Sequence, residues 1–160
     1  MPILHVQIAG QATNPEGKTV QVPPPIALHM RGPVIQVSIG LEQNAAQALL
    51  QQGKQVPTLK TGWALIDTGA SSTCIDEAAA KELGLPVIDT AKMSSASHAE
   101  TTCNVYPVQI NVPPALSFSS PRTIGAALAA QGLIALIGRD VLQHSTLFYN
   151  GLTGQITLAL

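Results

Sequence analysis

The stretch ALIDTGASST, residues 64–73, decides the fold of this 160-residue chain. Its first three residues form a continuous apolar run, which is typical of a strand buried on both faces. Asp67 follows at the end of this strand, and Gly69 permits a tight turn directly after it. The stretch therefore predicts a carboxylate that a buried strand delivers to the edge of a folded core.

A lone carboxylate in a dry site is costly and tends to become neutral. Two carboxylates that share one proton avoid this cost, because like charges about 3 Å apart cannot both ionise. The ionised member can take a proton from a water while the neutral member protonates the carbonyl oxygen of an amide. Such a pair would hydrolyse an amide without a metal. The sequence Asp-Thr-Gly occurs once in the chain, so the second carboxylate has to come from elsewhere.

By itself the tripeptide is a weak signal, expected by chance in about a few per cent of chains of this length. Its simplest alternative is a strand that ends in a turn, with Asp67 bonded to nearby backbone N–H groups. A second element strengthens the functional interpretation. Residues 135–142, ALIGRDVL, again run from an apolar strand into a glycine and then into a short helix.

The two motifs in this order resemble the retropepsin family, the retroviral-type aspartic proteases and their cellular and bacterial relatives. The resemblance covers residues 35–39 and 63–160. It implies a mostly β fold, a closed retropepsin-like barrel with one lobe per chain and one or two short helices. In this family the strand that carries Asp-Thr-Gly threads a loop that the second apolar strand closes. The Gly-Arg-Asp segment then opens a helix.

Retropepsins carry one Asp-Thr-Gly motif per chain and act as symmetric homodimers, so the resemblance implies an aspartic endopeptidase whose dyad is Asp67 from each of two chains. Thr68 would bond across the two-fold axis, and Gly69 would contact a peptide or protein substrate. Residues 155–160 would join an interface sheet, the alternative being an ordinary edge strand of the monomer. The further implied substrate-binding residues are Ala70, Ser71, Ala96, Ser97 and His98. The implied structural residues are Gly138, Arg139 and Asp140.

The family closes a hairpin flap over its substrate, and the candidate here is residues 92–102, KMSSASHAETT. It would lie between possible strands at residues 86–88 and 105–112. The segment contains no glycine, although its small residues could still make a mobile turn. A plain surface loop is the alternative interpretation.

The chain also departs from the family at Ser71, where retroviral enzymes have an Asp that pairs with the arginine of Gly-Arg-Asp. Arg139 therefore needs another partner, and the candidates are Asp76 or a backbone carbonyl. These departures leave a second hypothesis open. The chain could be a proteolytically silent module that binds peptides or dimerises.

Strict alternation of apolar and polar residues predicts half-buried strands in four places, residues 4–8, 35–39, 108–112 and 156–160. Helices are predicted at residues 44–52, 76–83 and 138–142, with Asn44 as a possible N-cap of the first. Trp63, the only tryptophan, is expected in the core. We expect a single domain, residues 1–160, with an N-terminal extension at residues 1–30 and an insertion at residues 41–61. A latent protease, activated by processing of that extension, is a further possibility.

Composition narrows the possible partners. Apolar residues make up 46% and charged residues 11% of the chain, which is a globular balance. A net charge of −1 and 3% aromatic residues do not favour nucleic-acid binding. No apolar run approaches a membrane span and no signal-peptide pattern is visible, so a cytoplasmic location away from membranes is expected.

The four histidines have no metal spacing, and no cofactor is implied. A thiol nucleophile made of Cys74 and His98 is conceivable, but Cys74 is better explained as a core residue.

Overall fold

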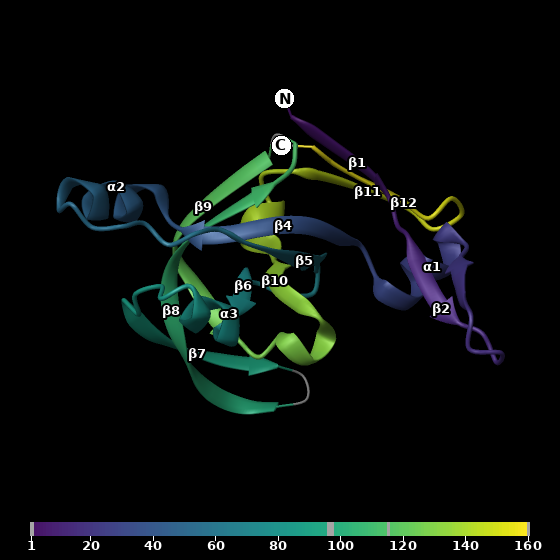
Figure 1. Ribbon diagram of the computed structural model, residues 1–160, viewed down its shortest axis with the longest axis horizontal. Helices are drawn as coiled ribbons and strands as arrows, with labels where there is room; N and C mark the ends of the chain where they lie inside the picture. The colour runs from purple at the N-terminus through teal and green to yellow at the C-terminus, as the bar shows by residue number, and fades with distance from the viewer. Residues whose placement is uncertain (1, 96–97, 115, 160) are drawn as a thin grey trace.

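A closed barrel forms the centre of the protein (Figure 1). The computed structural model describes residues 2–95, 98–114 and 116–159. Within them, neighbouring strands pair in the order β4, β5, β10, β6, β9 and β8, and a pairing between β4 and β8 closes the ring. The barrel strands are β4 (Val34–Leu41), β5 (Lys60–Ile66), β10 (Leu133–Ile137), β6 (Cys74–Asp76), β9 (Leu116–Ala126) and β8 (His98–Val112).

The period-2 pattern of the sequence explains which side chains fill the barrel. Val37 and Ile39 of β4 are fully buried, and so is Val108 of β8, while Gln36 between the inward-facing residues of β4 is exposed. Alternating residues of a strand point to opposite faces of a sheet, so one face of each strand makes the core. The predicted strands at residues 35–39 and 108–112 are confirmed, and so is the mostly β fold class with its closed barrel.

A second, three-stranded sheet contains both ends of the described chain. It consists of β1 (Ile3–Gln7), β12 (Gln155–Ala159) and β11 (Thr146–Asn150), with β12 in the middle. Ile156 and Leu158 of β12 are fully buried. Because β1 and β11 occupy both edges of β12, this strand has no free edge within the described residues. The expectation of an ordinary edge strand was therefore wrong for residues 155–159, whereas their place in an interface sheet between two chains stays a prediction.

The N-terminal segment is built into the fold. It continues from β1 through the hairpin of β2 (Gly10–Thr13) and β3 (Thr19–Val22) into α1 (Pro24–Arg31). Helix α1 was not predicted from the sequence, because prolines commonly mark turns. Two prolines at the start of a helix are tolerated, since the first N–H groups of a helix have no partner within it. Ala27 and Leu28 of α1 are buried in the core.

The segment between β4 and β5 carries α2 (Gln43–Gln51), which lies away from the barrel in Figure 1. Its N-cap is Glu42 and not Asn44, because the Glu42 carboxylate accepts the N–H groups of Asn44 at 2.9 Å and Ala45 at 3.0 Å. A glutamate can take this role here because its side chain is itself nearly buried, at 7% exposure.

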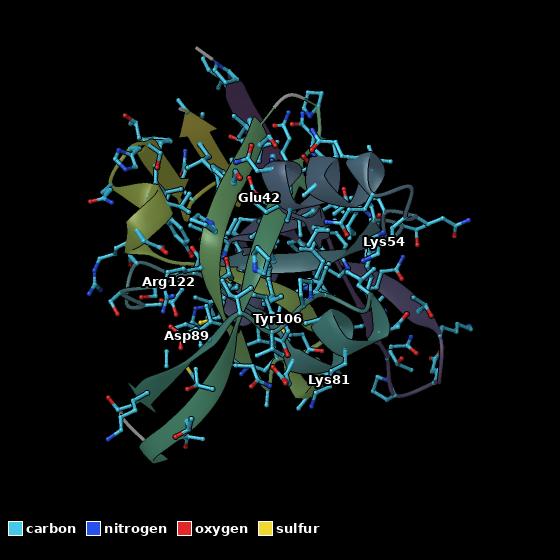
Figure 2. All side chains as sticks on the ribbon, turned by 90° about the vertical axis from the view of Figure 1, so that its left-hand side faces the viewer. Glu42, Lys54, Lys81, Asp89, Tyr106 and Arg122 are labelled. Atoms are coloured by element: carbon cyan, nitrogen blue, oxygen red, sulfur yellow. The ribbon has the colours of Figure 1, made fainter. Side chains whose placement is uncertain are left out.

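Near the cleft described below, the remaining helices are α3 (Glu77–Glu82), α4 (Arg139–Leu142) and the short 3₁₀ helix η1 (Ala129–Gln131). Strand β7 (Asp89–Ser95) pairs with the outer half of β8 and forms a hairpin that projects beyond the barrel (Figures 1 and 2). The predicted strand at residues 86–88 was wrong, since β7 begins at Asp89. Trp63 was also misplaced by the sequence analysis, because its side chain is 40% exposed and lies under the Arg31 guanidinium at 5.1 Å.

Candidate active site

Asp67 lies where β5 leaves the barrel. Its N–H donates to the carbonyl oxygen of Ile137 at 2.9 Å, which prolongs the parallel pairing of β5 with β10. Its Oδ1 accepts the N–H of Gly69 at 2.8 Å, and the residue is half-buried. The strand before Asp67 therefore ends in a turn in which Asp67 accepts a backbone N–H, as the simplest interpretation of the sequence predicted. This turn fixes one carboxylate oxygen toward the backbone of its own loop.

Strand β10 passes through the loop that carries this aspartate. On one side it runs parallel to β5, with Leu136 opposite Leu65, and on the other antiparallel to β6, with Leu136 opposite Cys74. The chain therefore leaves β5, goes around the end of β10 and returns as β6. At this crossing a Cβ on Gly138 would lie 2.5 Å from the carbonyl carbon of Ser72, so only glycine fits. The two motifs do cross, but in the reverse sense to the one the resemblance implied, because the second strand, β10, passes through the loop that follows the Asp-Thr-Gly strand.

A dense set of hydrogen bonds joins the two motifs. Both carboxylate oxygens of Asp140 accept the N–H of Thr73 at 2.9 Å, and Oδ1 also accepts the Thr73 hydroxyl at 2.7 Å. The same hydroxyl oxygen accepts the N–H of Gly138 at 3.0 Å. Asp140 thus holds the return arm of the loop, and this use of Thr73 was missed from the sequence.

Arg139 holds the other arm. Its Nη1 donates to the carbonyl oxygens of Thr68 and Gly69, both at 2.8 Å. Of the two partners that the sequence left open, the backbone carbonyl is therefore the one present. Asp76 is engaged elsewhere, since its Oδ2 caps α3 at Ala79.

The other oxygen of Asp76 fixes the segment that leads into η1. Oδ1 accepts the N–H groups of Leu128 and Ala129, both at 2.9 Å. Asp76 is 5% exposed, and a buried polar group is costly unless it is hydrogen-bonded. This residue therefore positions one wall of the space beside Asp67.

That space is a cleft of about 1100 Å³. Asp67 lines it together with Gly69, Ala70 and Ser71, three residues that the sequence analysis placed near substrate. The hairpin contributes residues on both strands, among them Met93 and Thr102. The apolar lining includes Cys74, Ile124, Ala126, Leu128 and Leu136. An open groove with apolar walls beside a carboxylate suits an extended, largely apolar chain.

The other predicted site residues are less informative. Ala96 and Ser97 lie outside the described residues, and for His98 the backbone alone is described, as the first residue of β8. The side chain of Thr68 is exposed, and its hydroxyl has no hydrogen-bond partner among the described residues. The interpretation of residues 92–102 as a plain surface loop was wrong for the described residues, because Lys92 pairs with Thr102 and Met93 with Thr101 in a hairpin whose register shifts between Met93 and Ser95.

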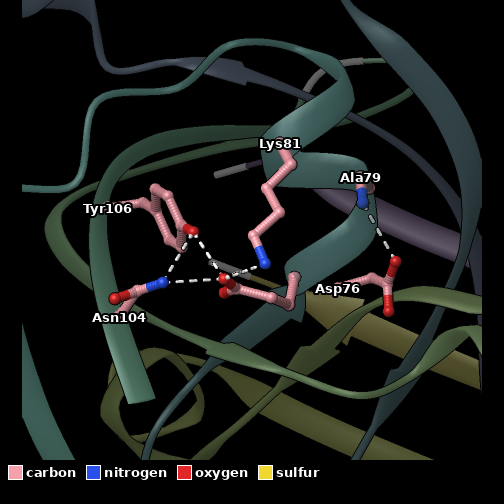
Figure 3. A network of polar contacts seen from close by, with 6 residues as sticks. Asp76, Ala79, Lys81, Asn104 and Tyr106 are labelled. Atoms are coloured by element: carbon pink, nitrogen blue, oxygen red, sulfur yellow. Dashed lines mark hydrogen bonds and ion pairs between the residues drawn. The ribbon is translucent and has the colours of Figure 1, made fainter.

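A second acid, Glu77, also lines the cleft and was not singled out from the sequence. Its Oε1 accepts the Asn104 amide at 2.8 Å and the Tyr106 hydroxyl at 2.9 Å, and it contacts Lys81 Nζ at 3.2 Å (Figure 3). Burial alone would raise the pKa of Glu77, but hydrogen bonds from Asn104, Tyr106 and Lys81 outweigh it and hold the pKa below its ordinary value. Glu77 is therefore a structural carboxylate tied to three donors.

The chemistry of Cys74 argues against the thiol alternative. Burial, with smaller contributions from nearby acids and from Cys103, raises the pKa of the Cys74 thiol to about 11. A thiol with that pKa is almost entirely protonated at neutral pH, and the thiolate is the nucleophilic form. Cys74 is buried and free, as expected for a core residue.

Comparison with known proteins agrees with this architecture. The sequence model of a family described as aspartyl protease matches residues 52–140, more than half of the chain. The chain therefore belongs to the aspartyl protease family, and the recognition made from its two motifs is confirmed.

Among solved structures, the chain is similar to a retropepsin-like aspartic protease from Rickettsia conorii, with a TM-score of 0.49 and 14% sequence identity. The match covers 98% of this chain and 91% of that one. No curated protein matches the sequence. In the described part of the chain, none of the helices has the length and apolar character needed to cross a membrane.

Proposed function

We propose that the protein is an aspartic endopeptidase of the retropepsin type, whose active site combines Asp67 from two copies of the chain. One observation carries the proposal. A single Asp-Thr-Gly turn, held by the crossing of β5 and β10, presents Asp67 at the edge of a cleft large enough for an extended peptide. Membership of the aspartyl protease family supports the reaction class.

The need for a second copy follows from the acids that line the cleft. Apart from Asp67, the described lining residues include one other acid, Glu77. That carboxylate cannot share a proton with Asp67. Its Oε1 already accepts hydrogen bonds from Asn104 and Tyr106 and pairs with Lys81, and its Oε2 is buried. A second Asp67 across a two-fold axis supplies the missing carboxylate. Thr68 beside it has an exposed hydroxyl with no hydrogen-bond partner among the described residues, and we propose that it bonds to the partner chain.

In the proposed mechanism the two Asp67 carboxylates share one proton and hold a water between them. The ionised carboxylate takes a proton from the water as it attacks the scissile carbonyl carbon, and the protonated one donates to the carbonyl oxygen. The resulting tetrahedral species collapses as the amide nitrogen is protonated and the C–N bond breaks. Ala70, Ser71 and the hairpin are proposed to hold the substrate as an added strand.

The test is a peptide-library digestion with Asp67→Asn and wild-type protein side by side, from acidic to neutral pH, with new termini identified by mass spectrometry. We expect cuts from wild type and a loss of at least about 1000-fold in the variant, since the water is no longer activated. Thermal unfolding of the variant serves as the folding control. Cuts that persist in a folded Asp67→Asn protein would overturn the mechanism.

A mixing experiment tests the dimer separately. Wild type and Asp67→Asn are combined in varying ratios at a constant total protein concentration, after dissociation and reassembly. If each site needs two aspartates, activity falls with the square of the wild-type fraction, because mixed dimers are inactive. A linear decline would mean that one chain forms a complete site. Peptides that bind without being cut, by either protein, would favour the silent module.

A further inference from the structure

The hairpin of β7 and β8 leaves the barrel at a defined point. Strand β8 pairs with β9 as far as Val105, which lies opposite Ile124. From Asn104 outward the described part of β8 pairs with β7 alone. A projecting two-stranded ribbon is marginally stable on its own, so its direction depends on what holds its base.

Two polar contacts hold that base, one on each strand. On β7, the Asp89 carboxylate pairs with Arg122 of β9 at 2.6 Å, and Figure 2 shows the two residues side by side. On β8, Asn104 and Tyr106 both donate to Glu77 of α3 (Figure 3). Asp89 lies directly opposite Val105, so the two contacts act at the same level of the hairpin.

The contact through Glu77 is the more rigid of the two. Asp89 and Arg122 are both about half exposed, and exposed ion pairs contribute little because water screens them. The Tyr106 side chain is 1% exposed, and the Glu77 side chain is 26% exposed. Gly125 lets the carboxylate lie close over β9, because a Cβ there would overlap Glu77 Oε2. Charge-assisted hydrogen bonds in such a site are short and directional.

We propose that Glu77 is a positioning residue that sets the height of the β7–β8 hairpin over the cleft, acting through Asn104 and Tyr106. The effect on substrate rests on the proposed endopeptidase function, whereas the effect on the hairpin does not. From Thr90 to Ser95 the hairpin arm is roughly 20 Å long, so a tilt of about 10° at its base moves its Ser95 end by about 3 to 4 Å. Such a shift is enough to make or lose the strand-like hydrogen bonds to a peptide beneath it.

Hydrogen–deuterium exchange of the free protein tests the positioning directly, comparing Glu77→Ala with wild type. We expect amides of residues 90–103 to exchange about five- to tenfold faster, while those of β4 and β10 are unchanged. Glu82→Ala is the matched control, because Glu82 lies on the same helix but contacts Lys60 of β5. Tyr106→Phe, which keeps the ring in the core, is the second variant and should loosen the same residues to a smaller degree.

The fold is expected to survive Glu77→Ala, since Glu77 Oε2 is buried without a hydrogen-bond partner among the described residues, and losing it offsets part of the cost. Unchanged exchange in residues 90–103 would overturn the proposal, and so would a uniform increase along the whole chain. The second result would mean that Glu77 serves general stability.

Kinetics then connect the hairpin to substrate. With the best-cut peptide from the library, Glu77→Ala should raise KM about fivefold and leave kcat within about twofold, because hairpin contacts act mainly on binding. A fall of about fivefold in kcat with an unchanged KM would contradict a role of the hairpin in substrate binding. If wild type cuts nothing, the proposed function fails, and the exchange experiment still decides whether Glu77 positions the hairpin.

Discussion

Asp140 binds Thr73 where the two motifs cross. Its carboxylate accepts hydrogen bonds from both the backbone N–H and the hydroxyl of Thr73. The two residues are 67 positions apart in the sequence. Their contact connects the start of β6 to the start of α4, and the loop that carries Asp67 ends at Thr73. The geometry of the candidate active site therefore depends on a residue pair outside the Asp-Thr-Gly motif.

Thr73→Val should be strongly destabilising for its size. Thr73 is 3% exposed, so valine fits the space but removes the donor to Asp140 and the acceptor for the Gly138 N–H. We expect the free energy of unfolding to fall by about 2 to 4 kcal/mol, because a charge-assisted bond is lost and a buried N–H is left unpaired. Urea unfolding of the variant and of wild type measures this change in the free energy of unfolding.

Thr146→Val on β11 is the control for that substitution, since Thr146 is exposed. A surface change of this kind should alter the free energy of unfolding by less than about 0.5 kcal/mol. Equal effects of the two substitutions would show that the Thr73 network is not a special anchor.

Arg139→Met should affect cleavage more than stability. The substitution keeps much of the side-chain length but removes the donor that fixes the carbonyl oxygens of Thr68 and Gly69. Since Arg139 is exposed, the free energy of unfolding should fall by about 1 kcal/mol. The cleavage rate should fall at least about tenfold, because a small displacement of the catalytic carboxylate is costly.

Arg31→Met is a matched control for Arg139. Arg31 is also exposed and donates to a backbone carbonyl, that of Ala9, at 2.7 Å. Its substitution should leave the cleavage rate within about twofold. Comparable rates for Arg139→Met and wild type in the library assay would mean that the loop holds its shape without the arginine.

The parts of the structure that the sequence predicted are those fixed by local pattern. Period-2 alternation located β4 and β12, and the apolar run before Asp67 located the end of β5, although β5 is fully buried on one face only and not on both as predicted. The crossing of the two motifs was implied by their resemblance to the retropepsin family, and the structure adds that Gly138 has to be small where it meets the chain around Ser72. The signals for the strands lie within a few residues of the strands that they predict, whereas the crossing joins segments that are far apart in the sequence.

The parts that were missed depend on distant contacts or on ambiguous local chemistry. Glu77 and Tyr106 are 29 residues apart, and neither residue type by itself indicates a contact that holds the base of a hairpin. The prolines before Ile26 favour a turn as much as a helix start, and tertiary packing of α1 decides between them. Trp63 is apolar by type, but the barrel interior is already filled by smaller side chains, and it lies partly outside under Arg31.

Glu42 predicts a pH-dependent contribution to stability. Hydrogen bonds from the N–H groups of Asn44 and Ala45 and from Ser119 hold the pKa of Glu42 below its ordinary value of 4.5, although burial opposes them. The contribution is therefore complete above pH 4.5 and is lost as the pH falls through the lower value of the folded protein. Glu42→Gln should cost about 1 to 2 kcal/mol at pH 7, as for loss of a helix cap.

The difference between Glu42→Gln and wild type should shrink as the pH is lowered, because wild-type Glu42 is then protonated as well. Urea midpoints at pH 7, 5 and 3 measure this. Glu16→Gln is the control, since Glu16 lies in an exposed ion pair with Lys18. A cost for Glu42→Gln that stays constant over this range would exclude the carboxylate as the source of the stabilisation.

The N-terminal segment should behave as part of the fold and not as a removable pro-segment. Strand β1 pairs with β12 over five residue pairs, and Ile8 directly after it is 2% exposed. Ile8→Ala should lower the free energy of unfolding by about 2 to 4 kcal/mol, because it leaves a cavity against the core. Ile3→Ala, at a position 57% exposed, should cost less than about 1 kcal/mol. A protein that lost residues 1–9 without a change in its urea midpoint would restore the latent-protease hypothesis.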